Sequence, residues 1–133
     1  MPGYATTGAT IDGQAGTAFA RNVGTSEVTI FTATVKTRLN ICTVTNQIKT
    51  TLPIRIYIKD VSGNTYDVVR NLRVTNQIIA WHYLVQPSSP VFGTLSEDSM
   101  PTGVVLQAGQ SICAISNYPN AFDVVIDLST GVQ

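Results

Sequence analysis

Apolar and polar residues alternate most clearly in residues 51–60, "TLPIRIYIKD". Successive side chains of a β-strand point to opposite faces of its sheet, so this pattern predicts a half-buried strand. The expected inward row is Leu52, Ile54, Ile56 and Ile58, and the expected outward row is Arg55, Tyr57 and Lys59. The next residues, "VSGNT", have the composition of a turn, in which Gly63 and Asn64 tolerate positive φ.

A second clear alternation lies near the end of the chain, in residues 122–128, "FDVVIDL". The expected inward row is Phe122, Val124, Ile126 and Leu128, and the expected outward row is Asp123, Val125 and Asp127. A domain of this size has one apolar core. We therefore expect the inward rows of the two segments to share that core.

Further β-branched and apolar segments predict the remaining strands. They are residues 27–35, 38–44, 66–74 and 78–85, and residues 104–116, where two short strands flank an Ala-Gly turn. No segment of ten or more residues combines a helical apolar stripe with helix caps. We therefore predict an all-β fold of seven to eight strands, an antiparallel β-sandwich of jelly-roll or immunoglobulin-like type.

The phrase "VTNQI" occurs twice, at residues 44–48 and 74–78. Each copy ends one apolar segment and begins another, and Asn46 or Asn76 is a residue that tolerates the left-handed conformation of a tight connection. The segments around the two copies share no other pattern. We interpret the phrase as a reused turn and not as a sequence repeat.

Residues 1–25 are rich in Gly, Ala and Thr and show no clear period. A segment of this composition buries too little apolar surface to fold alone, so we expect an extended N-terminal arm followed by a sandwich domain at residues 26–133. An arm of this kind could add a strand to a neighbouring subunit. Its deletion should then abolish assembly and leave a folded domain.

The small number and even balance of charged residues indicate which partners the protein binds. Charged residues make up 12% of the chain, and eight Lys and Arg balance eight Asp and Glu, whereas typical soluble domains are about 25% charged. Neither sign clusters, so we expect no nucleic-acid partner, and no apolar segment is long enough to span a membrane. A surface with few charges favours contacts with other copies or partner proteins.

Residues suited to catalysis or metal binding form no recognisable motif. His82 is the single histidine, and no Gly-x-Ser-x-Gly sequence is present. Glu97, Asp98, Asp123 and Asp127 show no spacing that requires a catalytic pair. Residues 60–67 resemble a calcium loop weakly, but the sixth-position Gly and twelfth-position Glu are missing, so a hairpin turn is favoured. We expect no enzyme activity, no metal and no cofactor.

Two cysteines, Cys42 and Cys113, are too few for a disulfide scaffold and lack metal-ligand spacing. Both lie in apolar, β-branched segments, where a cysteine most often behaves as a small buried hydrophobe. A disulfide between the two strands is the alternative. Synthesis in a reducing cytoplasm is the simplest interpretation.

Residues 42–74 and 104–130 together resemble small all-β structural proteins of tailed-bacteriophage particles. The first segment carries an apolar-x-apolar-Tyr-apolar strand before a Gly-containing hairpin. The second carries the corner formed by Leu106, Ala108, Gly109 and Ile112, with Gln110 where Asp is common. The resemblance implies a capsid decoration or cement protein, or a neck or tail component, and carries over no catalytic residues.

Two functional hypotheses follow. The first is a non-enzymatic virion protein, made in the host cytoplasm, that binds copies of itself and other virion proteins such as the major capsid protein or neck and tail proteins, with Val125 partly covered by a neighbour. The second is a carbohydrate-binding module or adhesin that uses Trp81, Tyr83 and Tyr118. Trp81 and Tyr83 alternate with His82, so two aromatic rings would share one face of their strand.

Overall fold

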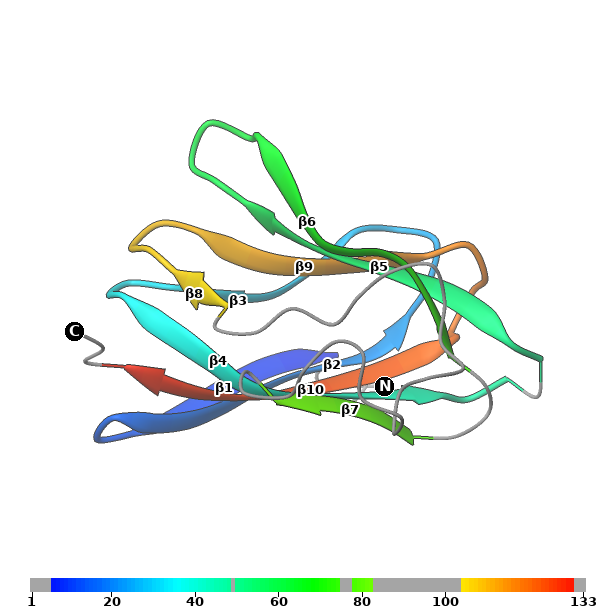
Figure 1. Ribbon diagram of the computed structural model, residues 1–133, viewed down its shortest axis with the longest axis horizontal. Coiled ribbons are helices and arrows are strands. Elements are labelled where there is room, and N and C mark those ends of the chain that lie inside the picture. The colour runs from blue at the N-terminus through cyan, green and yellow to red at the C-terminus, as the bar shows by residue number, and fades with distance from the viewer. Residues whose placement is uncertain (1–5, 49, 75–77, 83–103, 131–133) are drawn as a thin grey trace, which may run out of the picture.

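The computed structural model describes residues 6–48, 50–74, 78–82 and 104–130. These residues form ten β-strands, which build two antiparallel sheets packed as the two layers of a sandwich (Figure 1). The expected antiparallel β-sandwich is confirmed, with ten strands in place of seven to eight. This part of the chain holds no helix that could cross a membrane.

Sheet A has six strands and forms the lower layer in Figure 1. Its strands are β1 (Thr7–Asp12), β2 (Ala15–Val23), β4 (Thr37–Asn46), β7 (Ile78–His82), β8 (Val105–Leu106) and β10 (Phe122–Thr130). They are arranged in the order β1-β2-β10-β4-β7, and β8 pairs with the start of β4. The C-terminal strand β10 therefore lies in the middle of the sheet, between β2 and β4.

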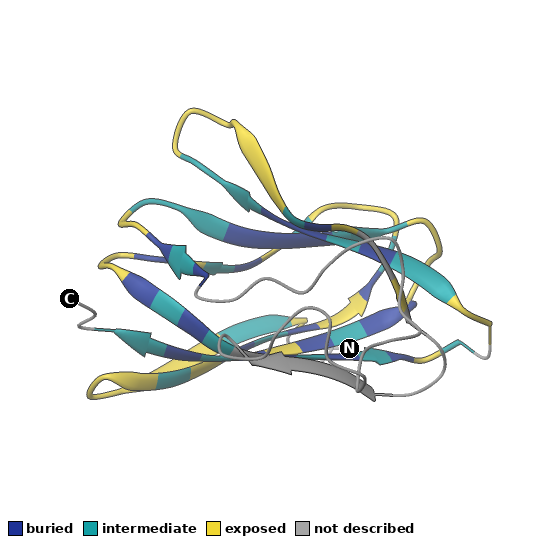
Figure 2. Ribbon diagram, viewed as in Figure 1, coloured by how far each residue is buried: buried dark blue, intermediate teal, exposed yellow. Residues whose placement is uncertain are grey.

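Sheet B has four strands and forms the upper layer in Figure 1. Its strands are β3 (Val28–Thr32), β5 (Leu52–Lys59), β6 (Thr65–Val74) and β9 (Ser111–Ser116). They are arranged in the order β3-β9-β5-β6. The tips of the β1–β2 and β5–β6 hairpins extend away from the two layers and are exposed to solvent (Figure 2).

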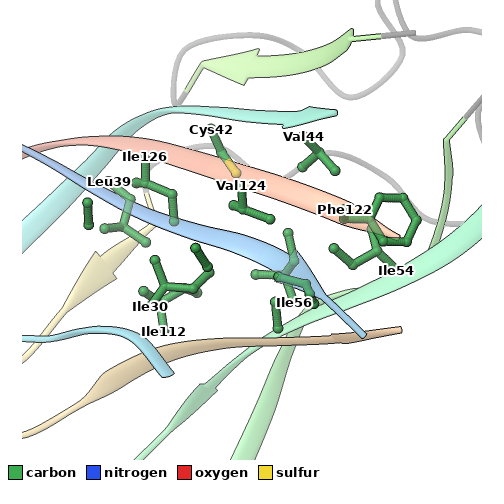
Figure 3. Packing of buried hydrophobic residues seen from close by; sticks show 14 of the residues in the cluster. Ile30, Leu39, Cys42, Val44, Ile54, Ile56, Ile112, Phe122, Val124 and Ile126 are labelled. Carbon is green, nitrogen blue, oxygen red and sulfur yellow. The ribbon is translucent and has the colours of Figure 1, made fainter. Parts of the chain in front are cut away.

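The core lies between the sheets and is built from the two rows that the sequence predicts (Figure 3). Ile54 and Ile56 of β5 are fully buried, and Ile58 packs against the same cluster at partial exposure. Phe122, Val124, Ile126 and Leu128 of β10 are all buried. The prediction of a shared core is confirmed.

Residues 7–23 are part of the sandwich, so the expected extended arm is wrong for this segment. β1 and β2 form a regular hairpin whose turn contains Gly13 at φ +66°. β2 pairs along β10, and its Ala18, Ala20 and Val23 are buried in the core. Deleting residues 1–25 would remove these core residues and a neighbour of the central strand, so a folded domain is no longer expected from that truncation.

The connections follow the predicted turn chemistry, with one correction. The first "VTNQI" phrase, residues 44–48, covers the end of β4 and lies before β5. The second, residues 74–78, begins at the last residue of β6 and ends at the first residue of β7. Asn46 acts through its side chain: its Oδ1 accepts from Ile48 N (2.7 Å) and its Nδ2 donates to Thr50 O (2.9 Å). Among the described residues only Asn22 and Asn120 combine a side chain with positive φ, so the left-handed conformation expected of Asn46 is wrong, whereas Asn76 lies outside these residues.

The Ala108-Gly109 turn joins β8 to β9 as predicted. Gly109 adopts φ +90°, and the Gln110 side chain accepts a hydrogen bond from Gln107 N (2.8 Å). Gln110 thus makes a turn contact of the kind that an Asp would make at this corner. The turn also bonds to Ala33, whose carbonyl accepts from Gly109 N (2.8 Å).

Both cysteines are buried and free. Cys42 points into the core from β4 (Figure 3), and burial raises the pKa of its thiol. Cys113 lies on β9, where its sulfur is 3.7 Å from Thr29 Oγ1 and burial again raises its pKa. The prediction of buried cysteines is confirmed, and the structure contains no bond between the two.

Candidate interaction surface

Val125 lies at the centre of the outer face of sheet A. Its strand, β10, has neighbours on both sides, and Val125 stands directly opposite Phe19 of β2 and Thr43 of β4. Residues that stand opposite one another in a ladder share a face of the sheet, so these three residues form a row across it. We call this row the Val125 face. Val125 is 42% exposed, which confirms the outward position predicted for it.

Phe19 is the residue of the Val125 face that lies nearest the β1 edge of the sheet. Its ring lies across Gly8 of β1, where a Cβ atom would approach Phe19 Cε1 to 2.7 Å. Any side chain at this position would therefore displace the ring. The guanidinium carbon of Arg21 lies 5.2 Å from the ring centroid, within the range of a cation–π contact.

Asp123, on one side of Val125, holds an irregular part of the sheet together. Asn22 adopts φ +58° where the register between β2 and β10 shifts. Asp123 Oδ1 accepts from Asn22 N (3.0 Å) and from Gln47 Nε2 (2.8 Å), and Gln47 Nε2 also donates to Asn22 Oδ1 (3.1 Å). Asp123 is therefore more than the plain surface group that its alternation with apolar residues suggests.

Asp127, on the other side of Val125, borders an open groove of about 480 Å³. Its Oδ1 accepts from Thr17 Oγ1 at 3.3 Å, and Asn40 Nδ2 donates to Ser129 Oγ at 2.6 Å. The groove is lined by Thr10, Asp12, Ala15, Gly16, Thr17, Asn40, Asp127, Leu128 and Ser129. The outer face of sheet A thus carries an apolar centre, and polar groups that bond mainly within the protein lie on both sides.

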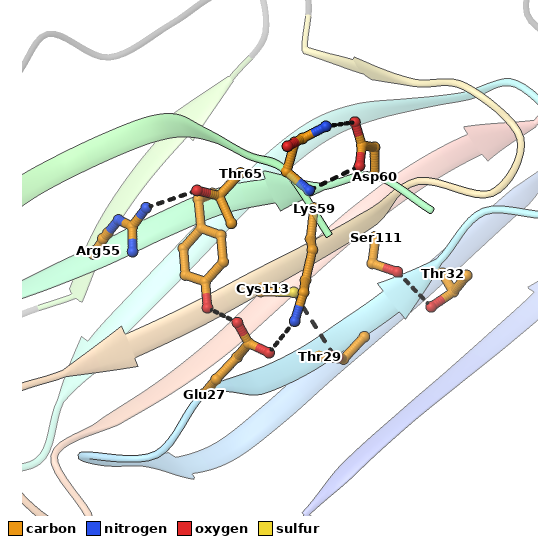
Figure 4. A network of polar contacts seen from close by, with 11 residues as sticks. Glu27, Thr29, Thr32, Arg55, Lys59, Asp60, Thr65, Ser111 and Cys113 are labelled. Carbon is orange, nitrogen blue, oxygen red and sulfur yellow. Dashed lines mark hydrogen bonds and ion pairs between the residues drawn. The ribbon is translucent and has the colours of Figure 1, made fainter. Parts of the chain in front are cut away.

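Sheet B presents a different outer face, which is crossed by a network of charged and polar contacts (Figure 4). Glu27 accepts hydrogen bonds from the Tyr57 hydroxyl and from Lys59 Nζ, the second at 2.9 Å. These two hydrogen bonds hold the pKa of Glu27 below its usual value of 4.5. The network links the segment before β3 to β5, although these strands are not neighbours in the sheet.

Tyr57 departs from the half-buried strand that alternation predicts. It lies on the outward row as expected, yet it is only 2% exposed. The Arg55 guanidinium carbon lies 4.1 Å from its ring centroid, and Glu27 accepts from its hydroxyl. Burial, and next the bond to Glu27, raise the pKa of the hydroxyl. The outer face of β5 is therefore covered by its own Arg55 and by Glu27, which precedes β3.

Arg55 also anchors β5 to β6. Its Nε donates to Asp67 Oδ1 at 2.6 Å, and Arg70 Nε donates to Asp67 Oδ2 at 3.1 Å. Burial alone would raise the pKa of Asp67, but the bonds from the two arginines outweigh it and lower that pKa. The pair of Arg55 with Asp67 joins β5 to β6, whereas the pair of Arg70 with Asp67 lies within β6, so these charges are used in contacts within sheet B.

Glu27 should make stability depend on pH in the acid range. A carboxyl whose pKa is lower in the folded state than in the unfolded state stabilises the fold while it is ionised, and this contribution is lost as the pH falls through the folded pKa. The parent should therefore exceed Glu27→Gln in free energy of unfolding near pH 7, and the difference should shrink below pH 4.5. Denaturant unfolding of both proteins between about pH 7 and pH 3 measures this difference.

Asp12→Asn is the matched control, because it removes one carboxylate from the exposed β1–β2 hairpin. If Glu27→Gln and the parent lose stability in parallel over the acid range, Glu27 is not the group responsible.

The weak resemblance to a calcium loop resolves into a hairpin turn. Asp60 Oδ1 accepts from the backbone N–H groups of Ser62 and Asn64, both at 2.9 Å, and its Oδ2 accepts from Asn64 Nδ2 and the Tyr66 hydroxyl. Burial opposes ionisation of Asp60, but these bonds outweigh it and lower its pKa. Gly63 adopts φ +89° in this turn. The described residues contain no group of three or more His, Cys, Asp or Glu that could hold a metal.

The aromatic residues of the carbohydrate hypothesis lie on different elements. Tyr118 is 44% exposed in the turn between β9 and β10, where its N–H donates to Ser116 Oγ at 3.0 Å. Trp81 and His82 belong to β7, where they pair with Cys42 and Ile41 of β4. Tyr83, Glu97 and Asp98 lie outside the described residues.

Sequence reasoning singled out Val125 and missed most of its surroundings. Phe19, Gly8 and Asn22 lie in the segment expected to be an arm, and Gln47 lies in a turn. The Asp12-Gly13 dipeptide was an available signal, because Asp-Gly between alternating segments is typical of a tight hairpin. Its recognition would have placed Phe19 on a strand.

No family model matches the sequence, and no curated protein matches it. Function is therefore inferred from the two outer faces and from the sequence resemblance.

Proposed function

We propose that this chain is a non-enzymatic structural protein of a tailed-phage particle, where it binds copies of itself and a capsid, neck or tail partner. A decoration or cement role is favoured. The sequence resemblance supports the phage context, and the low content of charged residues supports a surface that is covered in an assembly.

The observation that carries the proposal is the position of Val125 and Phe19. Both lie on the outer face of sheet A, and Val125 is 42% exposed in the middle of the sheet, so part of its apolar surface faces water in the isolated domain. Apolar residues surrounded by polar ones are typical of the centre of a protein–protein contact. Covering them with a neighbour would remove apolar surface from water.

The polar groups around this centre fit a binding role. Asp123 and Asp127 accept hydrogen bonds from their own sheet, and Thr43 and Thr17 add small hydroxyls. A partner would therefore meet an apolar centre, and its rim would contain polar groups of which Asp123, Asp127 and Thr17 already bond within the protein. Because a covered carboxylate without donors is costly, a partner would have to leave Asp123 and Asp127 in solvent at the rim or donate hydrogen bonds to them.

Val125→Lys tests this surface. A lysine here would bring an ammonium into the apolar centre of the contact, and covering it costs desolvation even when Asp123 or Asp127 pairs with it. We expect assembly to weaken about tenfold or more, the effect of ~1.4 kcal/mol. The fold should persist, because the core side of β10 is unchanged. Co-sedimentation of the variant with particles that lack the protein measures its assembly, and circular dichroism checks its fold.

Val61→Lys is the matched control, since Val61 is 83% exposed in the β5–β6 hairpin on the other sheet. It should assemble like the parent. If Val125→Lys occupies the particles as fully as the parent does, the outer face of sheet A is not the binding surface.

The phage context itself is tested by the protein composition of purified particles of the phage that encodes the chain. Mass spectrometry should find the chain as a particle component at constant copy number. Its absence there would reject the proposal. Binding of a glycan that quenches the fluorescence of Trp81, the single tryptophan, would instead favour the carbohydrate hypothesis.

A further inference from the structure

β1 is an edge strand with a regular backbone. Among the described residues it pairs with β2 alone, from Thr7 opposite Ala20 to Asp12 opposite Ala15, and the register does not shift over its length. The opposite side of β1 thus presents a row of backbone groups without a bulge. Rows of this kind are templates for pairing with a further strand.

The direction of these backbone groups follows from the hairpin. Arg21 N donates to Thr6 O at 2.7 Å, and hydrogen-bonded pairs alternate with non-bonded pairs along an antiparallel ladder. Gly8, Thr10 and Asp12 therefore bond toward β2. The N–H and C=O groups of Thr7, Ala9 and Ile11 point toward the open edge.

The edge of β1 differs from the two edges of sheet B. β6 carries exposed Arg70 and Arg73 and shifts register against β5, and β3 has only five residues and a register shift of its own. Charges, bulges and short length all discourage edge pairing. β1 has no Lys, Arg or Pro, its one charge is at its end, and its Ile11 is 44% exposed.

We propose that β1 pairs antiparallel with β1 of a second copy, about a two-fold axis at Ala9. In this register Ala9 meets Ala9 of the second copy and Ile11 meets its Thr7, so every outward-pointing backbone group of Thr7, Ala9 and Ile11 is bonded. The residues brought together lie on the same face of the joined sheet, as a ladder requires. Asp12 comes opposite the uncharged Thr6, so no like charges meet.

This inference deepens the proposed function and rests on it, because a contact of one strand is small. Such contacts bury less area than stable dimers need. Copies held side by side on a particle meet at high effective concentration, at which a weak edge contact forms. Two six-stranded sheets would then become one continuous sheet across neighbouring subunits.

Ala9→Cys tests the register directly. Residues of a hydrogen-bonded antiparallel pair have Cα atoms about 5.5 Å apart, a distance that a disulfide spans. Ala9→Cys should form a disulfide-linked dimer under mild oxidation, at the highest concentration at which the protein stays soluble. Thr10→Cys should not, because Thr10 would lie diagonal to its own copy, about 7–8 Å away. Non-reducing electrophoresis measures the dimer.

Ala15→Cys, exposed on β2 away from the edge, reports random collision. The parent protein shows how much disulfide-linked dimer forms through the buried Cys42 and Cys113 alone. Cross-linking of Ala9→Cys at least tenfold faster than Ala15→Cys supports the inference. Equal rates for the two variants, or no dimer from either, overturn it.

Ile11→Lys, added to Ala9→Cys, places a charge on the edge and should abolish the cross-link, whereas Ile11→Val should retain it. A cross-link that survives Ile11→Lys would overturn the pairing. The two proposals can fail separately. If Ala9→Cys cross-links but purified particles do not contain the chain, the proposed function alone is rejected. If the particles contain the chain but Ala9→Cys does not cross-link, the edge pairing alone is rejected.

Discussion

Replacement of Ile56 with alanine should lower the free energy of unfolding by about 2–5 kcal/mol, the range for a large apolar residue truncated in a core. Ile56 is fully buried in β5, where it stands opposite Ala114 of β9 and Val69 of β6. Its side chain points toward sheet A (Figure 3). The loss combines transfer energy with the cavity that the small Ala114 cannot fill. Denaturant unfolding, with the slope checked against the parent, measures it.

Val61→Ala is the control for this experiment, because Val61 is apolar, lies near β5 and is exposed. Its free energy of unfolding should stay within about 0.5 kcal/mol of the parent. A loss in Ile56→Ala no larger than that in Val61→Ala would show that Ile56 does not face the core.

Alternation predicted the strands whose inward residues are large. β5 and β10 were the clearest, since isoleucine, valine, leucine and phenylalanine recur at every second position and most of the residues between them are polar. The predicted segments that follow residue 26 correspond to the eight strands from β3 to β10, and their limits differ by a few residues. The connections at Gly63 and at Ala108-Gly109 could also be predicted, because glycine tolerates the positive φ that a tight turn requires.

The N-terminal hairpin could not be recognised from hydrophobic size. The inward row of β2 includes Ala18 and Ala20, and the large apolar residue between them, Phe19, points outward. Small residues that alternate with others do not produce a clear hydrophobic pattern in the sequence. They nevertheless fit beside the central strand β10, because its Phe122 and Val124 already fill the core there. The inward position of Ala18 and Ala20 and the outward position of Phe19 are therefore set by the packing of the core and not by the strand preference of these residues.

Polar contacts between strands distant in sequence were also beyond prediction. Tyr57 is buried because Glu27 and Arg55 cover it, and Asp123 is bonded because Asn22 and Gln47 reach it. Each contact depends on which strands become neighbours. The sequence pattern indicates the strands and their faces, and the order of strands in the sheets follows only from the three-dimensional structure.

Ala18→Asp should cost about 3–5 kcal/mol, the range for an uncompensated buried charge. Ala18 is fully buried on β2, opposite Ile126 of β10 and Ala9 of β1, so a carboxylate there would face the apolar core. Thermal and denaturant unfolding measure the loss. Ala15→Asp, the same substitution at an exposed position of the same strand, should cost no more than about 1 kcal/mol, because its carboxylate stays in solvent and only Asp12 directly opposite repels it. If residues 1–25 were an arm outside the domain, the two variants would be equally stable, so a difference between them decides whether β2 belongs to the folding unit.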